Sequence, residues 1–171
     1  MEDQFRISRF FRNRSERDPD MVAVYDYDNK IRFTYRNLLD RASSVAAFQL
    51  EHGIKKGDRV AIFAKNSMES MDILYSLQYT GAILTTYNFR LRAEELVGLL
   101  TSESPAMLFY DAAFVEKIEV LKPSLPNTFF VSLDNDNPLG DVCYDEALAV
   151  SAGKMPCVCL LYTSDAADDL T

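Results

Sequence analysis

The chain has 171 residues, of which 48% are hydrophobic and 12% aromatic, so it is long enough to bury the core of one domain. Its 18 Lys and Arg against 26 Asp and Glu give a net charge of −8, the wrong sign for broad attraction to nucleic acid. No apolar run reaches the roughly eighteen residues of a membrane span, residues 1–17 lack a secretory signal, and three cysteines make no disulfide framework. An acidic cytoplasmic protein is the expectation.

The first expected helix covers residues 5–17 and is stopped by Pro19. Its five arginines make it basic, so a membrane-surface helix is one interpretation. We favour the alternative, in which the helix docks on the body of the protein through its phenylalanines, Phe5, Phe10 and Phe11. Residues 22–27 and 31–34 flank a short polar turn and predict a β-hairpin.

A long helix is expected next, from Tyr35 to about His52, with Thr34 as its N-cap and Gly53 at its end. Its predicted core-facing stripe consists of Leu39, Ala42, Ala46 and Leu50.

Short apolar runs then alternate with helical patterns. The runs begin at residues 59, 83, 107 and 128, which are 24, 24 and 21 residues apart. Helical patterns lie between them, over residues 67–80, 92–101 and 112–121. Because the runs are apolar on both faces, they predict buried parallel strands. The expected fold is α/β, with serial βα units, a mainly parallel sheet flanked by helices, and an amino-terminal helix and hairpin.

The pattern changes after Ser132. Residues 134–141 form a polar stretch, and residues 144–150 predict a short helix. The polar stretch is like a calcium-binding loop only superficially, because Pro138 replaces the third ligand and Leu139 stands where glycine is needed. We therefore expect a solvated connection.

Few residues point to catalysis. The single histidine, His52, lies at a helix end, where a structural role is the default, so no catalytic triad can be assembled. Cys157 and Cys159, with Cys143 upstream, make a weak metal signal. The six glycines form no phosphate-binding motif. We predict no catalytic residue, no metal ligand and no intact cofactor site.

Four stretches in order nevertheless carry a resemblance: residues 33–38 (FTYRNL), 53–61 (GIKKGDRVA), 77–82 (LQYTGA) and 88–91 (NFRL). Together they resemble the amino-terminal subdomain of the AMP-forming acyl-CoA synthetases, in the adenylate-forming superfamily of AMP-binding enzymes. The resemblance spans about residues 5–150, so the chain is expected to be an incomplete domain. Asn88 and Arg90 would lie past a strand's carboxyl end, where α/β sheets place ligand contacts. We favour a structural alternative for Arg90, an ion pair with Glu94 or Glu95.

The resemblance implies a parent enzyme that uses ATP and Mg²⁺ to adenylate a carboxylic acid and then transfers the acyl group to CoA. In such enzymes a Ser/Thr/Gly-rich loop clamps the phosphates. Thr163 and Ser164 stand where that loop would begin, but Asp165, Asp168 and Asp169 follow where the family has small residues. These carboxylates would repel a triphosphate.

The end of the chain has a simpler explanation. Residues 159–168 (CLLYTSDAAD) match the translation of an adaptor used in transposase-based DNA library preparation, and we take this match as a hypothesis for their origin. We therefore predict that residues 1–158 are a partial ligase subdomain and that residues 159–171 are a non-native tail. Without that tail the net charge would be −5.

The sequence thus predicts part of an ATP-dependent acid–thiol ligase that activates an organic or fatty acid. The isolated chain is expected to be inactive and to bind none of ATP, Mg²⁺ and CoA. A non-catalytic α/β module that binds a ligand or partner is the alternative. The acid, the acceptor thiol and the oligomeric state stay open.

Overall fold

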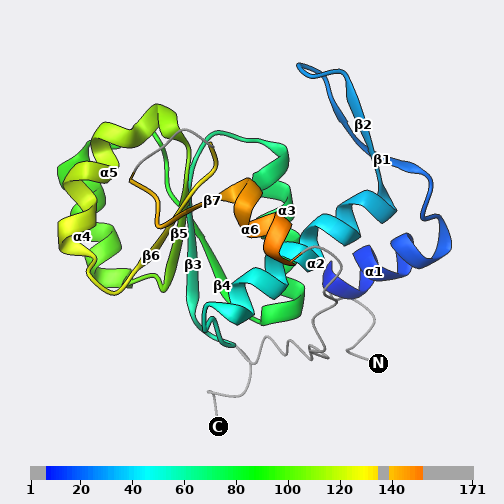
Figure 1. Ribbon diagram of the computed structural model, residues 1–171, viewed down its shortest axis with the longest axis horizontal. Helices are drawn as coiled ribbons and strands as arrows, with labels where there is room; N and C mark the ends of the chain where they lie inside the picture. The colour runs from blue at the N-terminus through cyan, green and yellow to red at the C-terminus, as the bar shows by residue number, and fades with distance from the viewer. Residues whose placement is uncertain (1–6, 135–138, 152–171) are drawn as a thin grey trace, which may run out of the picture.

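The computed structural model describes residues 7–134 and 139–151, and every structural statement below concerns these residues (Figure 1). The helices and strands follow in the order α1 (Ile7–Arg17), β1 (Val22–Asp26), β2 (Ile31–Thr34), α2 (Tyr35–Glu51), β3 (Arg59–Phe63), α3 (Met68–Thr80), β4 (Ile83–Thr86), α4 (Ala93–Glu103), β5 (Met107–Tyr110), α5 (Val115–Leu121), β6 (Phe129–Ser132), β7 (Val142–Cys143) and α6 (Tyr144–Ser151). Two short 3-10 helices, η2 (Ala112–Phe114) and η3 (Lys122–Ser124), flank α5.

Five strands form one parallel sheet in the order β4-β3-β5-β6-β7. Four of them were predicted, and their observed starts differ from the expected ones by at most one residue. The prediction from the sequence did not include β7, because only Val142 and Cys143 of this strand pair with β6. A two-residue strand carries no apolar periodicity that could reveal it.

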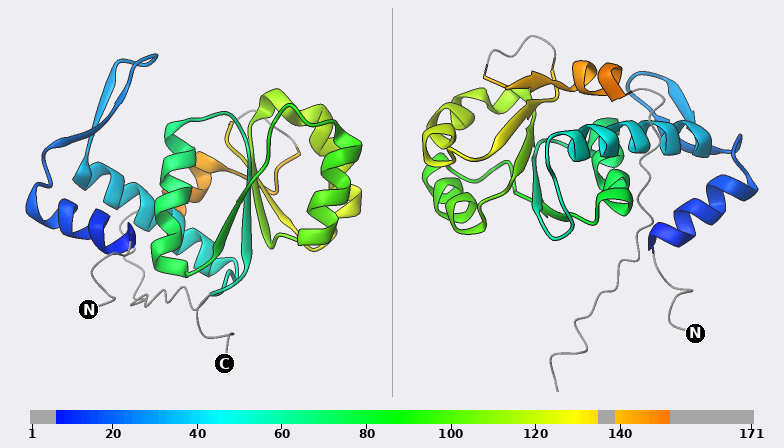
Figure 2. Two further views of the ribbon diagram at one scale, coloured as in Figure 1. Left: turned by 180° about the vertical axis from the view of Figure 1, so that it is seen from behind. Right: turned by 60° about the horizontal axis from the view of Figure 1, so that its bottom comes forward.

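Helices cover both faces of the sheet (Figures 1 and 2). On one face α2, α3 and α6 enclose a core that includes Phe48, Val60, Ile73 and Phe109. On the other face α4 and α5 pack over Phe63, Leu100, Leu108 and Phe130. Side chains of β3 and β5 alternate between these two cores, as expected of strands buried on both faces. The predicted α/β architecture is therefore confirmed.

Helix α2 begins at a capping box, in which the Asn37 N–H donates to the Thr34 hydroxyl and the Thr34 N–H donates to the Asn37 side chain. The predicted stripe is only partly correct. Ala42 and Ala46 are fully buried, but Leu39 and Leu50 are only half-buried, while Leu38, Val45 and Phe48, which the stripe left out, are buried. The buried face is wider than the prediction because α2 packs against both α3 and α6.

The turn between α2 and β3 aligns two strands. Gly57 has φ +89°, and its N–H donates to the carbonyl of Gly81, which ends α3 with φ +69°. The Asp58 carboxylate accepts the Lys55 N–H at 2.8 Å, as expected for this turn. The Asp58 carbonyl accepts the Ile83 N–H at 2.8 Å, so β3 and β4 start side by side.

Helix α1 and the antiparallel hairpin β1–β2 lie beside α2 and α3, away from the sheet (Figure 1). Phe11 is 5% exposed and stacks on Tyr75, with ring centroids 4.1 Å apart. This contact confirms that α1 docks on the body of the protein through Phe11. The same prediction for the side chains of Phe5 and Phe10 falls outside what the structure describes. No helix in residues 7–134 and 139–151 is long and apolar enough to span a bilayer.

Candidate functional site

The carboxyl ends of the parallel strands meet at one edge of the sheet, the upper edge in Figure 1. In open α/β sheets this edge is where ligands bind, because loops from several strands converge there. Here the loops after β3, β4 and β5 contribute Asn66, Asn88 and Asp111, and Asp134 follows β6. The predicted position of Asn88 and Arg90 just beyond a strand is confirmed.

The loop after β4 has a defined turn structure. The Asn88 side-chain oxygen accepts the Arg90 N–H at 3.0 Å, and the Asn88 carbonyl accepts the Leu91 N–H at 3.0 Å. Asn88 and Arg90 are both exposed. The side chain of Arg90 therefore extends from a folded loop at the carboxyl edge of the sheet.

The ion pair expected for Arg90 does not form in the described part of the chain. The Glu95 carboxylate instead accepts the Arg92 N–H at 2.9 Å, at the start of α4, where a carboxylate is favoured by the helix dipole. The Arg90 guanidinium lies over the Phe89 ring, 5.5 Å from its centroid. The structural alternative was wrong about the partner, and the positive charge stays available at the surface.

The two carboxylates that follow β5 and β6 are engaged by the backbone. Asp111 accepts the Ala113 N–H at 2.8 Å, and Asp134 accepts the Ala112 N–H at 2.7 Å. Tyr110, the last residue of β5, is fully buried, and burial raises its pKa to about 12, so its hydroxyl stays protonated. Residues 7–134 and 139–151 contain no group of three or more His, Cys, Asp or Glu arranged to hold a metal ion.

A groove of about 360 Å³ separates the hairpin from the start of α3. Its carboxylates are Asp26, Asp28 and Glu69. The Asn29 side chain and N–H both donate to Asp26, and these bonds lower the pKa of this carboxyl. This acidic side of the edge disfavours a phosphate, whereas the Arg90 loop favours one.

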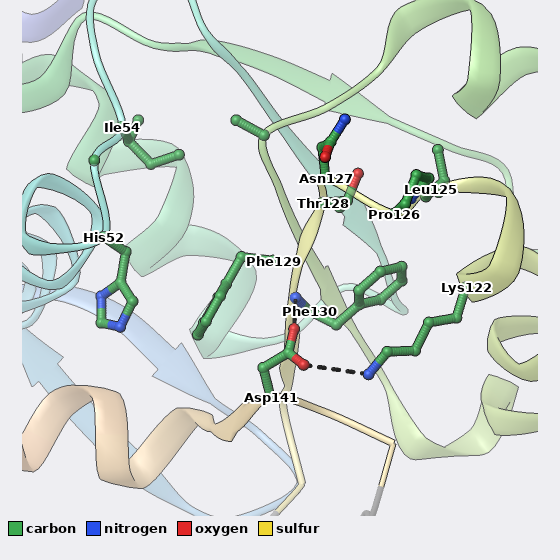
Figure 3. Close-up of a pocket in the computed structure, with 12 residues that line it drawn as sticks. His52, Ile54, Lys122, Leu125, Pro126, Asn127, Thr128, Phe129, Phe130 and Asp141 are labelled. Atoms are coloured by element: carbon green, nitrogen blue, oxygen red, sulfur yellow. Dashed lines mark hydrogen bonds and ion pairs between the residues drawn. The ribbon is translucent and has the colours of Figure 1, made fainter.

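A larger hollow, about 620 Å³, lies at the opposite edge of the sheet, where the strands begin (Figure 3). His52 lines it, with Nδ1 2.9 Å from the Phe48 carbonyl and its ring against Phe129. The charges of Lys122 and Asp141 face each other across 3.3 Å. The polar groups of this hollow are thus paired with other groups of the protein, and its larger volume alone does not make it the candidate functional site. The structural role predicted for His52 agrees with its contacts.

The sequence interpretation missed a buried ionic network. Asp72 of α3 is fully buried, and its Oδ2 accepts from Arg41 Nη2 at 2.6 Å and from the Tyr144 hydroxyl at 2.8 Å. Burial raises the pKa of Asp72, and the guanidinium and hydroxyl partly offset that rise. Burial also raises the pKa of Tyr144, which keeps its hydroxyl protonated as the donor.

A signal for this network was present in the sequence. Asp72 stands between Met68 and Ser76 at four-residue spacing, on the stripe of α3 that is buried. A carboxylate on such a stripe requires a cation, because an unpaired buried charge is unstable. The identity of that cation could not be read locally, since Arg41 is 31 positions away.

Several predicted residues lie outside the described part of the chain. These are Thr163 and Ser164 of the expected phosphate loop, Cys157 and Cys159 of the weak metal signal, residues 135–138 of the polar stretch, and the whole of residues 159–171. At the described ends of the polar stretch, Asp134 binds the Ala112 N–H and Asp141 the Phe130 N–H.

Comparison with known proteins decides the family. The sequence profile of the AMP-binding enzyme family matches residues 11–164. The chain belongs to this family. It is 32% identical to the 2-succinylbenzoate–CoA ligase of Geobacillus sp. (strain WCH70), over 68% of this chain and 23% of that one. It is 26% identical to the 3-oxocholest-4-en-26-oate–CoA ligase of Rhodococcus rhodochrous, over 78% of this chain and 25% of that one.

This AMP-binding family member thus spans about a quarter of the length of those two relatives. Its fold is that of solved acid–CoA ligases. The benzoate CoA ligase of Burkholderia xenovorans LB400 superposes with a TM-score of 0.80 and 17% identity, covering 94% of this chain and 31% of that one. The predicted resemblance to the AMP-forming acyl-CoA synthetases is confirmed at the level of family and fold.

Proposed function

We propose that the chain is part of an ATP-dependent acid–thiol ligase of the cytoplasm. The complete enzyme would adenylate an organic or fatty acid with ATP and Mg²⁺, release pyrophosphate, and transfer the acyl group to CoA. The observation that carries this proposal is the family match over residues 11–164, which includes all the strands of the parallel sheet. The names of the relatives support a carboxylic acid and CoA as the substrates.

Within the described residues, Arg90 is our candidate contact for an anionic group of the nucleotide or of CoA. It is exposed at the carboxyl edge of the sheet, and no carboxylate in residues 7–134 and 139–151 pairs with it. A guanidinium in this setting binds phosphate through charge-assisted hydrogen bonds. Asn88 contributes by fixing the turn that carries Arg90.

The described residues do not supply the rest of an ATP site. They contain no glycine-rich phosphate loop, and at the carboxyl edge Asp111 and Asp134 already accept backbone N–H groups. The sequence after Ser164 has carboxylates where a phosphate loop has small residues. We therefore derive no step through ATP or Mg²⁺ from these residues, and we propose that the isolated 171-residue chain does not adenylate acids.

The origin of residues 159–171 is a separate proposal. The family match ends at residue 164, inside the stretch that equals the translated adaptor, and residues 162–164 fit both descriptions. Sequencing the parent locus decides between them. A genomic read that continues through residues 165–168 without interruption would contradict the adaptor origin.

An exchange assay tests the proposed inactivity. ATP–pyrophosphate exchange by the isolated chain, with a panel of carboxylic acids, is expected to stay at background. Exchange above background would overturn the proposal. The alternative, a non-catalytic α/β binding module, would gain support if the complete gene ended at Thr171 and encoded no downstream ligase sequence.

A binding experiment tests the role of Arg90. Inorganic pyrophosphate, titrated into ¹⁵N-labelled chain, should shift the amide signals of residues 88–92. Arg90→Met should weaken this binding by about tenfold, the loss expected for one charge-assisted contact. Arg92→Met is the matched control, because Arg92 is also exposed and lies two residues away. Equal weakening by both variants would contradict a specific contact at Arg90.

A further inference from the structure

One lysine of α5, Lys117, donates hydrogen bonds to the loop that carries Arg90, residues 88–91, which is called the Arg90 loop. Lys117 Nζ donates to the carbonyl of Phe89 at 2.7 Å and to the carbonyl of Leu91 at 2.6 Å. These two carbonyls belong to the residues immediately before and after Arg90 in the chain. The residues on both sides of Arg90 are therefore bonded to the same ammonium group, which restrains the backbone at residue 90.

The surroundings of Lys117 commit it to this loop. Its ammonium lies 5.7 Å from the centre of the Phe63 ring and 5.8 Å from that of Phe114. No carboxylate in residues 7–134 and 139–151 forms an ion pair with it, so the two carbonyls and the ring faces satisfy its charge. Lys117 is half-buried, so the folded chain loses stability if the carbonyls that accept from its ammonium move away.

Aromatic packing strengthens the same connection. The Phe89 ring stacks on the Phe114 ring, with centroids 5.6 Å apart. The Arg90 guanidinium also lies over the Phe89 ring. The loop after β4 is thus joined to the segment after β5 by two hydrogen bonds and one ring stack. This connection places an exposed arginine on a fixed support.

We infer that Lys117 is a positioning residue, which fixes residues 88–91 so that Arg90 faces an anionic ligand group. The inference rests on the proposed function, because it takes the Arg90 loop to be a ligand-contacting loop. Lys117 itself does not reach the ligand, since its donated bonds end on the carbonyls of the loop. A fixed arginine binds an anion more tightly than a mobile one, because less conformational entropy is lost on binding.

The chain offers a matched control for Lys117. Lys122, five positions along, also donates to a main-chain carbonyl, that of Leu139 at 2.7 Å, and also lies over a ring, that of Phe130. It stands in the hollow at the opposite edge of the sheet. Lys122→Met removes a carbonyl bond, a ring contact and also the ion pair with Asp141 at 3.3 Å, so it costs a further polar contact of its own. Only Lys117→Met frees the Arg90 loop.

The test combines loop exchange with anion binding. Amide exchange and chemical shifts of residues 88–92 are measured in the free chain, and inorganic pyrophosphate is then titrated. Lys117→Met should speed the exchange of the Leu91 N–H and weaken pyrophosphate binding about fivefold, whereas Lys122→Met should change neither. Lys117→Arg, whose guanidinium can donate to both carbonyls, should restore most of the binding.

Two results would overturn the inference. One is unchanged Leu91 exchange in Lys117→Met, and the other is equal weakening of pyrophosphate binding by Lys122→Met. If pyrophosphate shifts no amide signal at Arg90 in the unaltered chain, the proposed anion contact is wrong. The inference that Lys117 positions Arg90 for an anion is then wrong as well. The exchange data from the free chain still decide, separately, whether Lys117 fixes the loop.

Discussion

The two faces of the parallel sheet are held by different kinds of interaction. Between α2, α3 and α6 the apolar core surrounds buried polar side chains, with Asp72 bonded to Arg41 and Tyr144, and Gln49 accepting from Ser76 at 3.2 Å. Under α4 and α5 the buried residues are almost all apolar, among them Phe63, Leu96, Leu100, Leu108 and Ile118. Lys117 makes its polar contacts at the margin of this second face.

The two faces should therefore respond differently to substitutions. Apolar packing is non-directional, so α4 and α5 are held mainly by shape and buried area. Hydrogen bonds and ion pairs have fixed directions, so the Asp72 network defines how α6 sits against α2 and α3. Buried ionic groups are a poor source of net stability, because desolvation opposes the attraction between the charges. The apolar face should therefore carry more stability, and the polar face more orientation.

The largest expected loss is on the apolar face. Leu108 is fully buried in β5, between strands β3 and β6. Leu108→Ala should lower the free energy of unfolding by about 4 kcal/mol, through lost transfer free energy and a cavity. Urea denaturation monitored by circular dichroism measures this change. A loss below about 1 kcal/mol would contradict the role given to this face.

The next effect separates the single groups of the network from the network as a whole. Asp72→Ala should lower the free energy of unfolding by about 3 kcal/mol, because it leaves Arg41 without its buried partner. Replacing Arg41, Asp72 and Tyr144 together by Met, Leu and Phe should restore most of that loss. As a surface control, Glu16→Ala removes a pair with Arg12 that is 64% exposed on both sides, and should change stability by less than about 0.5 kcal/mol.

The network also predicts a pH dependence. The folded-state pKa of Asp72 is raised above its ordinary value of 3.8, mainly by burial, so the folded chain binds a proton more readily than the unfolded chain. Stability from this group therefore rises as the pH falls from the raised pKa toward 3.8, and is lost as the pH rises. Asp72→Asn should remove this dependence.

Urea denaturation at pH 5 and pH 7 checks the sign. The stability of the unaltered chain relative to Asp72→Asn should be greater at the lower pH. The opposite change would mean that the Arg41 guanidinium outweighs desolvation and that the pKa of Asp72 is lowered.

The smallest effect concerns a local signal that belongs to neither face. Thr34→Ala removes the side-chain acceptor for the Asn37 N–H at the start of α2 and should cost about 1 kcal/mol. Thr34→Ser retains the acceptor and is the matched control. Equal losses in both variants would place the effect in side-chain packing rather than in capping.

Local chemistry made much of the fold predictable. Thr34, Ser67 and Gly81 mark helix ends through caps and a left-handed turn, which depend on residues close in sequence. The parallel strands were visible as short apolar runs at regular intervals. What could not be predicted depends on distant partners: the pairing of β7 with β6, and the bond from Tyr144 to Asp72 across 72 positions.

For the candidate site too, features set by neighbouring residues could be predicted and those set by distant partners could not. The position of Asn88 and Arg90 beyond β4 could be predicted, because strand and loop are adjacent in sequence. The ion pair expected for Arg90 was wrong, since the Glu95 carboxylate binds a backbone N–H of its own helix start instead. Lys117 reaches the loop from 26 and 28 positions away, and no local pattern singled it out.

The most direct test of the proposed function uses the protein encoded by the complete parent locus. Its ATP–pyrophosphate exchange should be measured with short-, medium- and long-chain fatty acids and with aromatic acids, each in the presence of Mg²⁺. Exchange that depends on at least one acid, followed by thioester formation when CoA is added, is the expected result. A folded, full-length protein that shows no acid-dependent exchange with any of these acids would contradict the proposal.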